Sequence, residues 1–243
     1  MKSLFLLLLL FAQLIRASAA DAETARALAE KGDWRAAVAA YEAMVDAHPY
    51  NPSLQYNLAL CYDYAGDIGH AVLAYERCLR FSPRSSDARH NLDLLRESHS
   101  LPAVSMVGKS LPAFTAWISA TEWQSLCLLA AIVMIGGAWW WVLHASHQSR
   151  VPPLSVTMVG LFLMMGSIVI LQFREREEKR AVITAADIPL LLSPFPSAEV
   201  ITTCPPGSMV MVEQTQGSFL YGEMLPQGTK GWLPRSAVQQ VSF

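Results

Sequence analysis

Charge is scarce in this chain of 243 residues. Asp, Glu, Lys and Arg make up 16% of it, hydrophobic residues make up 53%, and the formal net charge is −2. Because nucleic-acid binding needs an excess of positive charge to neutralise phosphates, this composition does not favour a nucleic-acid partner. Charged residues are also absent from two long apolar segments, Leu126–Leu143 and Leu154–Phe173.

Short catalytic motifs are absent as well. The sequence contains no glycine-rich phosphate-binding loop, no nucleophile elbow and no zinc-protease motif. Its six histidines include one pair at helical metal-ligand spacing, His144 and His147, without a fitting carboxylate or cysteine as a third ligand. We therefore predict a protein that is not an enzyme and that has no catalytic residue, no metal site and no cofactor.

The two uncharged segments have the length of membrane-spanning helices. At about 1.5 Å per residue, each can cross a hydrocarbon core of about 30 Å. Tryptophans flank the first segment at Trp117, Trp123 and 139–141, as they do at membrane interfaces. The alternative, a helical hairpin buried in a soluble core, would need larger flanking domains to cover it. The predicted transmembrane helices cover residues 123–144 and 154–174, and the loop over 145–153 carries Arg150.

Local patterns add detail to this hairpin. A capping box formed by Thr121 with Gln124, or by Ser119 with Glu122, would start the first helix. Because neither apolar segment, Leu126–Leu143 or Leu154–Phe173, holds an Asp, Glu, Lys or Arg, transport of protons or ions is not favoured. Small residues would let the two helices pack closely in lipid. These are Ala130, Ala131, Gly136 and Gly137 on the first span and Gly160 and Gly166 on the second.

The N-terminus has the pattern of a secretory signal peptide over residues 1–20, with Lys2, an apolar stretch and small residues at the cleavage site. An uncleaved anchor is the alternative. Export predicts a protein of the bacterial inner (cytoplasmic) membrane with its N- and C-terminal domains in the periplasm. The positive-inside rule points the other way, but it weakens for domains exported by their own signal. The conflicting charges are Lys109, Arg174, Arg176, Lys179 and Arg180 outside, against Arg150 inside.

Residues 21–97 repeat with a period of 34. This resembles the tetratricopeptide repeat, an all-α helix–turn–helix unit of the same period. The resemblance predicts repeats over 21–51 and 52–85 and a capping helix over 86–97, followed by a linker over 98–122. The matched positions include Gly32 with Gly66, Tyr41 with Tyr75, Glu42 with Glu76 and Pro49 with Pro83.

Repeats of this family present a groove to a peptide or a partner helix. One subfamily clamps a C-terminal carboxylate with basic residues, but here Ala22 and Asp87 occupy two of those positions, although Asn57 matches a third. That specificity is therefore not predicted, and plain surface is an equal alternative for each groove residue. The predicted protein-binding residues are Arg26, Tyr56, Asn57, Leu60, Arg89 and His90.

The four cysteines do not predict a disulfide framework. Cys61 and Cys78 lie on antiparallel helices of one repeat, roughly 13 Å apart at helical rise and beyond the roughly 7 Å Cα limit for a bridge. Cys127 lies in the first span and Cys204 in the C-terminal domain, without a partner in reach.

The C-terminal residues change to short strand-like runs separated by Pro and Gly. Such runs are typical of a small all-β barrel. The closing segment Gly231–Pro234, followed by Val238 and Val241, resembles the end of a bacterial SH3-like domain over residues 181–243. The predicted strands cover residues 181–183, 188–192, 198–202, 209–213, 218–223 and 230–233.

SH3 domains of eukaryotes bind proline-rich helices in an aromatic groove. Pro234 matches the groove proline, but Ala237 and Phe219 stand where a tyrosine and a tryptophan would be, so binding of proline motifs is not predicted. Phe219, Tyr221 and Trp232 are candidates for an aromatic protein-binding surface, although packing in the barrel core is the favoured interpretation.

The order of parts resembles the BatE-type proteins of bacterial aerotolerance operons. The resemblance implies a multi-domain membrane protein that works beside MoxR-type AAA+ ATPases and membrane proteins with von Willebrand factor A-type domains. We expect a membrane-anchored, non-enzymatic scaffold that binds these protein partners in the cell envelope through its tetratricopeptide groove and its SH3-like domain. The alternative is an envelope protein that binds peptidoglycan peptides through the SH3-like domain.

Overall fold

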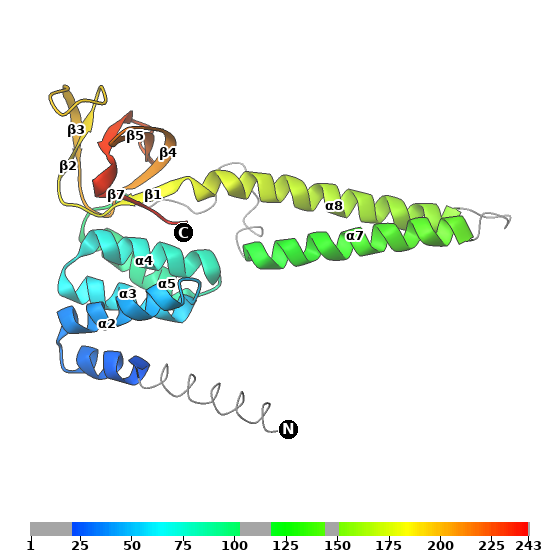
Figure 1. The fold of residues 1–243 in the computed structure, drawn as a ribbon, viewed down its shortest axis with the longest axis horizontal. Coiled ribbons are helices and arrows are strands. Elements are labelled where there is room, and N and C mark those ends of the chain that lie inside the picture. The colour runs from blue at the N-terminus through cyan, green and yellow to red at the C-terminus, as the bar shows by residue number, and fades with distance from the viewer. Residues whose placement is uncertain (1–20, 103–117, 144–150, 243) are drawn as a thin grey trace, which may run out of the picture. The chain divides into compact units, whose positions relative to one another are not determined.

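The structure is a computed structural model that describes residues 21–102, 118–143 and 151–242. It divides into two compact units. One unit combines the N-terminal helices with the C-terminal sheet, and the other is a helical hairpin that lies between them in the sequence (Figure 1). The predicted signal peptide, most of the predicted linker and the His144–His147 pair lie outside the described residues.

The N-terminal helices form the helix–turn–helix array that the period of 34 predicts. The side chains of Asp33, Asn51 and Asp67 cap helices by accepting hydrogen bonds from backbone N–H groups of the first turn. Gly32 and Gly66 occupy the left-handed region in the turns, with φ of 77° and 80°. The helices cover residues 21–30, Trp34–Ala47 (α2), Pro52–Ala65 (α3), Ile68–Phe81 (α4) and Ser86–Ser98 (α5).

Small and aromatic side chains build the core of the array. Ala59 on α3 and Ala71 on α4 are fully buried, so the two helices of the second repeat approach closely. Tyr41 and Tyr75, which occupy the same position in the two repeats, are both buried. The predicted packing of the repeats is therefore present.

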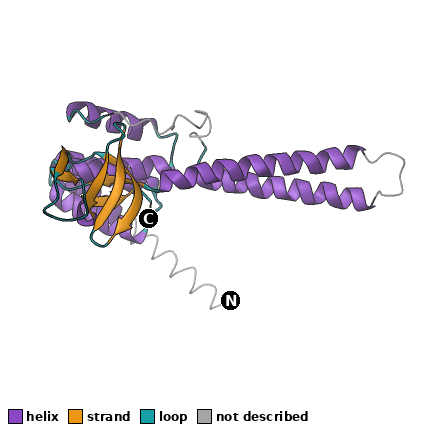
Figure 2. Ribbon diagram, turned by 90° about the horizontal axis from the view of Figure 1, so that it is seen from above, coloured by secondary structure: helices purple, strands orange, loops and turns teal. Residues whose placement is uncertain are grey.

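The C-terminal residues form one curled antiparallel sheet (Figure 2) with the strand order β3-β2-β6-β5-β4-β1-β7. Side chains such as Ile183, Leu190 and Leu233 fill its inner face. The sequence patterns did not predict β7, which follows a short 3-10 turn and pairs with β1. The strands are Arg180–Ile183 (β1), Ile188–Leu191 (β2), Val200–Cys204 (β3), Met209–Gln216 (β4), Phe219–Leu225 (β5), Lys230–Pro234 (β6) and Val238–Gln240 (β7).

The hairpin consists of α7 (Ala120–Leu143) and α8 (Val151–Glu178), which lie side by side in both ribbon views (Figures 1 and 2). Of the two predicted capping boxes, the structure forms Ser119 with Glu122. The Ser119 backbone N–H donates to Glu122 Oε2 at 2.7 Å, and the Glu122 N–H donates to Ser119 Oγ at 3.3 Å. Helix α8 starts earlier than predicted and includes both prolines of the expected loop, which suit a first turn.

Glycines allow the close packing of α7 and α8. A Cβ on Gly137 would lie 2.7 Å from Thr157 Oγ1, and one on Gly160 would lie 2.6 Å from the Met134 backbone N. Gly136 has no such neighbour within 4 Å. The predicted small-residue contact is therefore present, but only at some of the predicted positions.

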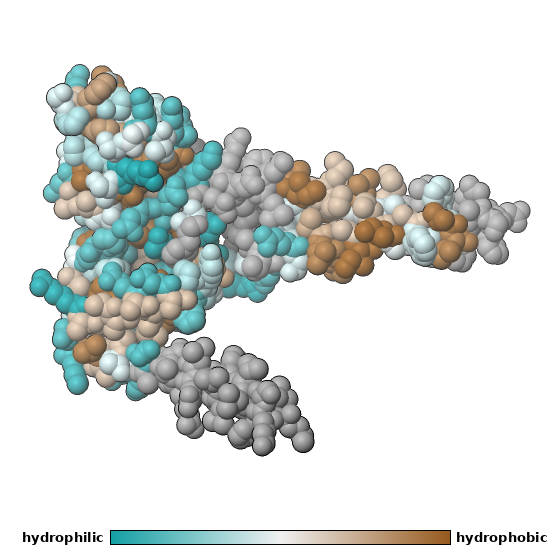
Figure 3. Space-filling view, in the orientation of Figure 1, coloured by the Kyte–Doolittle hydropathy of each residue, from teal (hydrophilic) through white to brown (hydrophobic). Residues whose placement is uncertain are grey.

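Apolar side chains cover the outside of the hairpin (Figure 3). Within the described residues, Glu122–Leu143 is long and apolar enough to cross a membrane. The part of α8 whose side chains are described contains a shorter apolar stretch, Ser155–Val169. One of the two predicted spans therefore passes a test of length and composition, and the second stays a prediction.

Candidate protein-interaction surfaces

The helical array and the sheet pack against each other within one unit. Strand β1 leads into a turn whose backbone lies directly on α4. A Cβ on Gly69 would lie only 2.5 Å from the backbone oxygen of Thr184, so glycine allows this approach. Gly207, in the left-handed region with φ of 85°, makes a second close contact, with Leu101 and Val72. The first residues of the predicted linker are thus part of a packed interface.

A buried ion pair lies at this interface. The guanidinium of Arg96 on α5 donates to Glu76 Oε1 on α4 at 2.5 Å, and the two side chains are 7% and 3% exposed. Arg96 also contacts Met209 Sδ of the sheet at 3.2 Å. The sheet shields this pair from water, so each charge is compensated only by the other. Loss of one partner would leave the other charge buried without compensation.

Strand β7 makes further polar contacts with α4. Arg77 Nη2 donates to the backbone oxygen of Gln240 at 2.9 Å, and Gln239 Nε2 lies 3.2 Å from His70 Nε2. Burial lowers the pKa of Arg77. The sequence patterns predicted two independent modules and missed this interface. The glycine on a helix face at Gly69 and the repeated glutamate at Glu76 were its only sequence signals.

Two predicted groove residues line one cavity of the array. Tyr56 and Asn57 border a space of about 310 Å³ between α3, α4 and the start of α5. The Tyr56 hydroxyl accepts a hydrogen bond from Asn91 Nδ2 at 3.1 Å. Cys78 lies in the same lining, and burial raises its pKa to about 11, so the thiol is neutral at physiological pH. The rest of the lining is mostly polar and includes Ser53, Ser85 and the carboxylate of Asp87.

The other predicted groove residues do not join that lining. Arg26 pairs with Glu30 on its own helix at 2.9 Å, and Arg89 donates to the backbone oxygen of Pro83 at 2.6 Å. Leu60 is half-buried, and His90 is exposed. The structure therefore brings together only part of the predicted groove.

The three aromatic candidates of the sheet share its outer face. Tyr221 on β5 lies opposite Trp232 on β6, with ring centroids 5.1 Å apart, and Phe219 lies opposite Pro234. All three aromatic side chains are half-buried, whereas Leu220 between them points into the core. The favoured interpretation of core packing was therefore wrong, because strand alternation places these positions outside.

No group of three or more His, Cys, Asp or Glu side chains that could hold a metal ion occurs within residues 21–102, 118–143 and 151–242. All four cysteines are free thiols.

One protein-family model, the bacterial transcriptional activator domain, matches residues 10–94. This match covers the helical array, which is less than half of the chain, and reaches neither the hairpin nor the sheet. Comparison with curated proteins found no match. The match agrees with the helical repeat-like N-terminal region of the structure. Such a region suggests a scaffold related to protein interaction or to DNA binding.

Proposed function

We propose that this chain is a membrane-anchored, non-enzymatic scaffold that binds protein partners in the bacterial cell envelope. The observation that carries the proposal is the packing of the array against the sheet, through Gly69, Arg96 and Arg77. The whole hairpin separates these two parts in the sequence. A segment that crosses a membrane twice returns the chain to the face from which it started, so two crossings are compatible with this packing and one is not.

The surface of the hairpin supports the membrane assignment. Glu122–Leu143 has 22 residues, and at about 1.5 Å per residue a helix of that length exceeds a hydrocarbon core of about 30 Å. Large apolar side chains, among them Leu128, Ile135 and Phe162, are exposed on both helices. Ser167 donates to the backbone oxygen of Leu163 at 2.9 Å, so its hydroxyl needs no water.

Two surfaces of the anchored unit are suited to partners. The cavity beside Tyr56 would receive a peptide or a helix, and the Tyr221–Trp232 pair would contact a second protein surface through aromatic rings. Because one packed unit carries both, a partner complex that meets one surface meets the other at high effective concentration. By the family resemblance, membrane proteins with von Willebrand factor A-type domains and their MoxR-type ATPase are the partners we propose.

The membrane topology of the chain tests the proposed location of its N- and C-terminal domains outside the cytoplasm. A reporter that is active only outside the cytoplasm should be active after Phe243, and one that fluoresces only inside should fluoresce when inserted near Arg150. The inverted pattern would contradict the envelope location and would leave both modules facing the cytoplasm.

Co-purification tests partner binding. The tagged full-length protein should retain von Willebrand-type membrane proteins, and a Tyr221→Ala, Trp232→Ala variant should lose them. Lys31→Gln, in an exposed turn of the array, is the control and should retain them. Sedimentation of the protein with isolated cell wall, without these partners, would contradict the scaffold and support binding of peptidoglycan peptides.

A further inference from the structure

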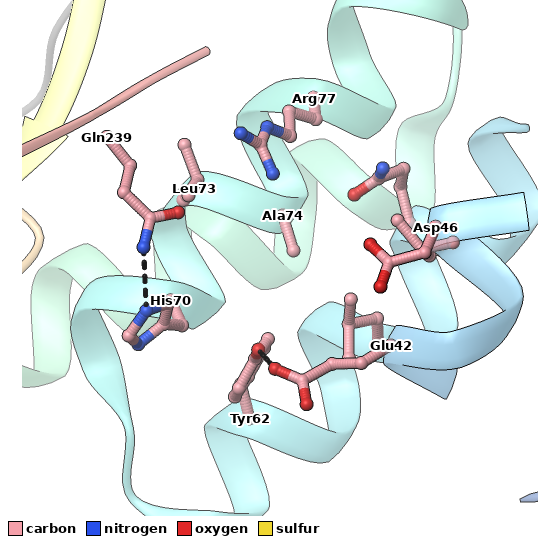
Figure 4. A pocket seen from close by; sticks show the side chains of 11 residues that line it. Glu42, Asp46, Tyr62, His70, Leu73, Ala74, Arg77 and Gln239 are labelled. Carbon is pink, nitrogen blue, oxygen red and sulfur yellow. Dashed lines mark hydrogen bonds between the residues drawn. The ribbon is translucent and has the colours of Figure 1, made fainter. Parts of the chain in front are cut away.

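A second cavity of the array lies between α2, α3 and α4 and has a volume of about 340 Å³. Figure 4 shows Glu42 and Asp46 on one side of it, Tyr62 below, and His70 and Arg77 on α4. Gln239 of strand β7 completes the lining, so the docked sheet is part of the site. Neither the predicted groove residues nor the aromatic face of the sheet belongs to it.

A buried acceptor without a donor faces this cavity. Gln55 on α3 is fully buried, and its Nε2 donates to the backbone oxygen of Pro49 at 3.2 Å. That bond sets the amide orientation, because the reversed amide would place two carbonyl oxygens against each other. Gln55 Oε1 then accepts no hydrogen bond from any described residue. Since Gln55 lines the cavity, a donor on a ligand there would satisfy this oxygen.

Two carboxylates on α2 set the charge that the cavity prefers. Glu42 and Asp46 are one helical turn apart and are exposed to solvent at the cavity. The Tyr62 hydroxyl donates to Glu42 Oε1, and burial raises the pKa of Tyr62, which keeps this donor protonated. One hydrogen bond leaves the remaining acceptor positions of Glu42 available to a ligand.

The remaining polar groups of the lining face the sheet. Arg77 is the one side chain of certain positive charge in this lining, and its Nη2 donates to the backbone of β7. His70 Nδ1 lies 2.9 Å from the carboxylate of Asp67, and its Nε2 lies against Gln239. The α2 side therefore keeps two negative charges, and the positive charge lies at the opposite wall (Figure 4).

We propose that this cavity binds the cationic end of a lysine or arginine side chain from a protein partner. The ammonium or guanidinium lies between the carboxylates of Glu42 and Asp46 and donates to Gln55 Oε1. The aliphatic stem contacts Val45 and Leu58, which also line the cavity. Only a ligand that is both a cation and an N–H donor satisfies the acceptor and the two charges together. The site does not depend on membrane anchoring.

Binding of a matched pair of small probes to the purified full-length protein tests this site. The cationic probe is Nα-acetyl-lysine N-methylamide, whose side-chain ammonium is free. The control probe, Nα-acetyl-norleucine N-methylamide, has a similar stem without the charge. Ligand-observed NMR titration should detect binding of the lysine probe and not of the norleucine probe. Asp46→Asn should weaken that binding about tenfold. Asp93→Asn, which removes an exposed carboxylate of α5 outside the cavity, should leave it unchanged.

The role of the buried acceptor is tested separately. Gln55→Leu removes the oxygen and should also abolish binding of the lysine probe. If this variant does not fold, as judged by circular dichroism, Glu42→Gln tests the site at its second carboxylate instead. Glu42 is exposed and should tolerate the change, and binding of the lysine probe should weaken about tenfold. Equal binding of both probes, no binding of the lysine probe, or unchanged affinity in Asp46→Asn would each overturn the proposal.

Discussion

The two repeats place the same glutamate in opposite environments. Glu42 of the first repeat is exposed beside a cavity, where Tyr62 donates to it. Glu76, 34 positions later, is 3% exposed and pairs with Arg96 beneath Met209 of the sheet. The two repeats share Ala, Tyr and Glu at these positions, so the surroundings determine which glutamate supports structure and which can meet a ligand: Arg96 and the docked sheet at Glu76, and an open cavity at Glu42.

Removal of the buried glutamate should give the largest effect. Glu76→Ala leaves Arg96 buried without its partner and should lower the free energy of unfolding by about 3–5 kcal/mol. The matched change Glu42→Ala, at an exposed site, should cost less than about 1 kcal/mol. Urea unfolding of the purified full-length protein measures both. Similar losses in the two variants would contradict the asymmetry between the repeats.

A methyl group at the docking contact should have the next largest effect. Gly69→Ala places a Cβ 2.5 Å from the Thr184 oxygen and should destabilise the unit by about 1–3 kcal/mol, because backbone must move. Ala39→Ser adds one atom on an exposed part of α2 and is the control. The same urea titration compares them, and an unchanged midpoint for Gly69→Ala would show that the contact is not formed.

The second repeat also carries two buried thiols, where the first has Ala27 and Met44. Burial raises the pKa of Cys61 and Cys78 from 9.0 to about 11. The unfolded state therefore releases these protons first, and stability falls as pH rises from about 9 towards 11. At pH 10 the loss should be about 1 kcal/mol per thiol.

Urea midpoints at pH 8 and pH 10 measure this loss. The Cys61→Ala, Cys78→Ala variant is the control for other groups that titrate in alkali, and its midpoint should fall less between the two pH values. An equal fall in both proteins would show that the thiols ionise normally in the folded state.

The smallest effect is expected at an exposed ion pair. Arg26 and Glu30 are 69% and 64% exposed at their side chains, and water and salt screen their attraction. Arg26→Gln should therefore leave the thermal midpoint unchanged within error, in contrast to any change at Arg96. A clear loss of stability would show that the first helix is held by this pair.

Local patterns were sufficient to predict most elements of the fold, although not strand β7. Side-chain caps at Asp33 and Asp67, left-handed turns at Gly32 and Gly66, and the Ser119–Glu122 capping box each depend on residues close in the sequence. The helices and most strands follow from such short-range rules.

Contacts between distant segments could not be predicted in the same way. The helical period of apolar residues and their alternation in strands show which face of an element is apolar. These patterns do not show which other element covers that face. The docking of Thr184 on Gly69 and the burial of Glu76 therefore became visible only in three dimensions. The aromatic residues of β5 were misplaced because Leu220 and Tyr221 are both apolar enough for a core, and only the register of the sheet assigns them to opposite faces.

Cross-linking between the array and the sheet in intact cells tests the central claim most directly. His70 and Gln239 are in contact across the interface. A full-length protein with His70→Cys and Gln239→Cys, and with its native cysteines replaced by alanine, should form an internal cross-link with a short bis-maleimide. A protein in which each single cysteine is labelled but the pair does not cross-link would contradict the account, because the two parts would then be separate in the cell.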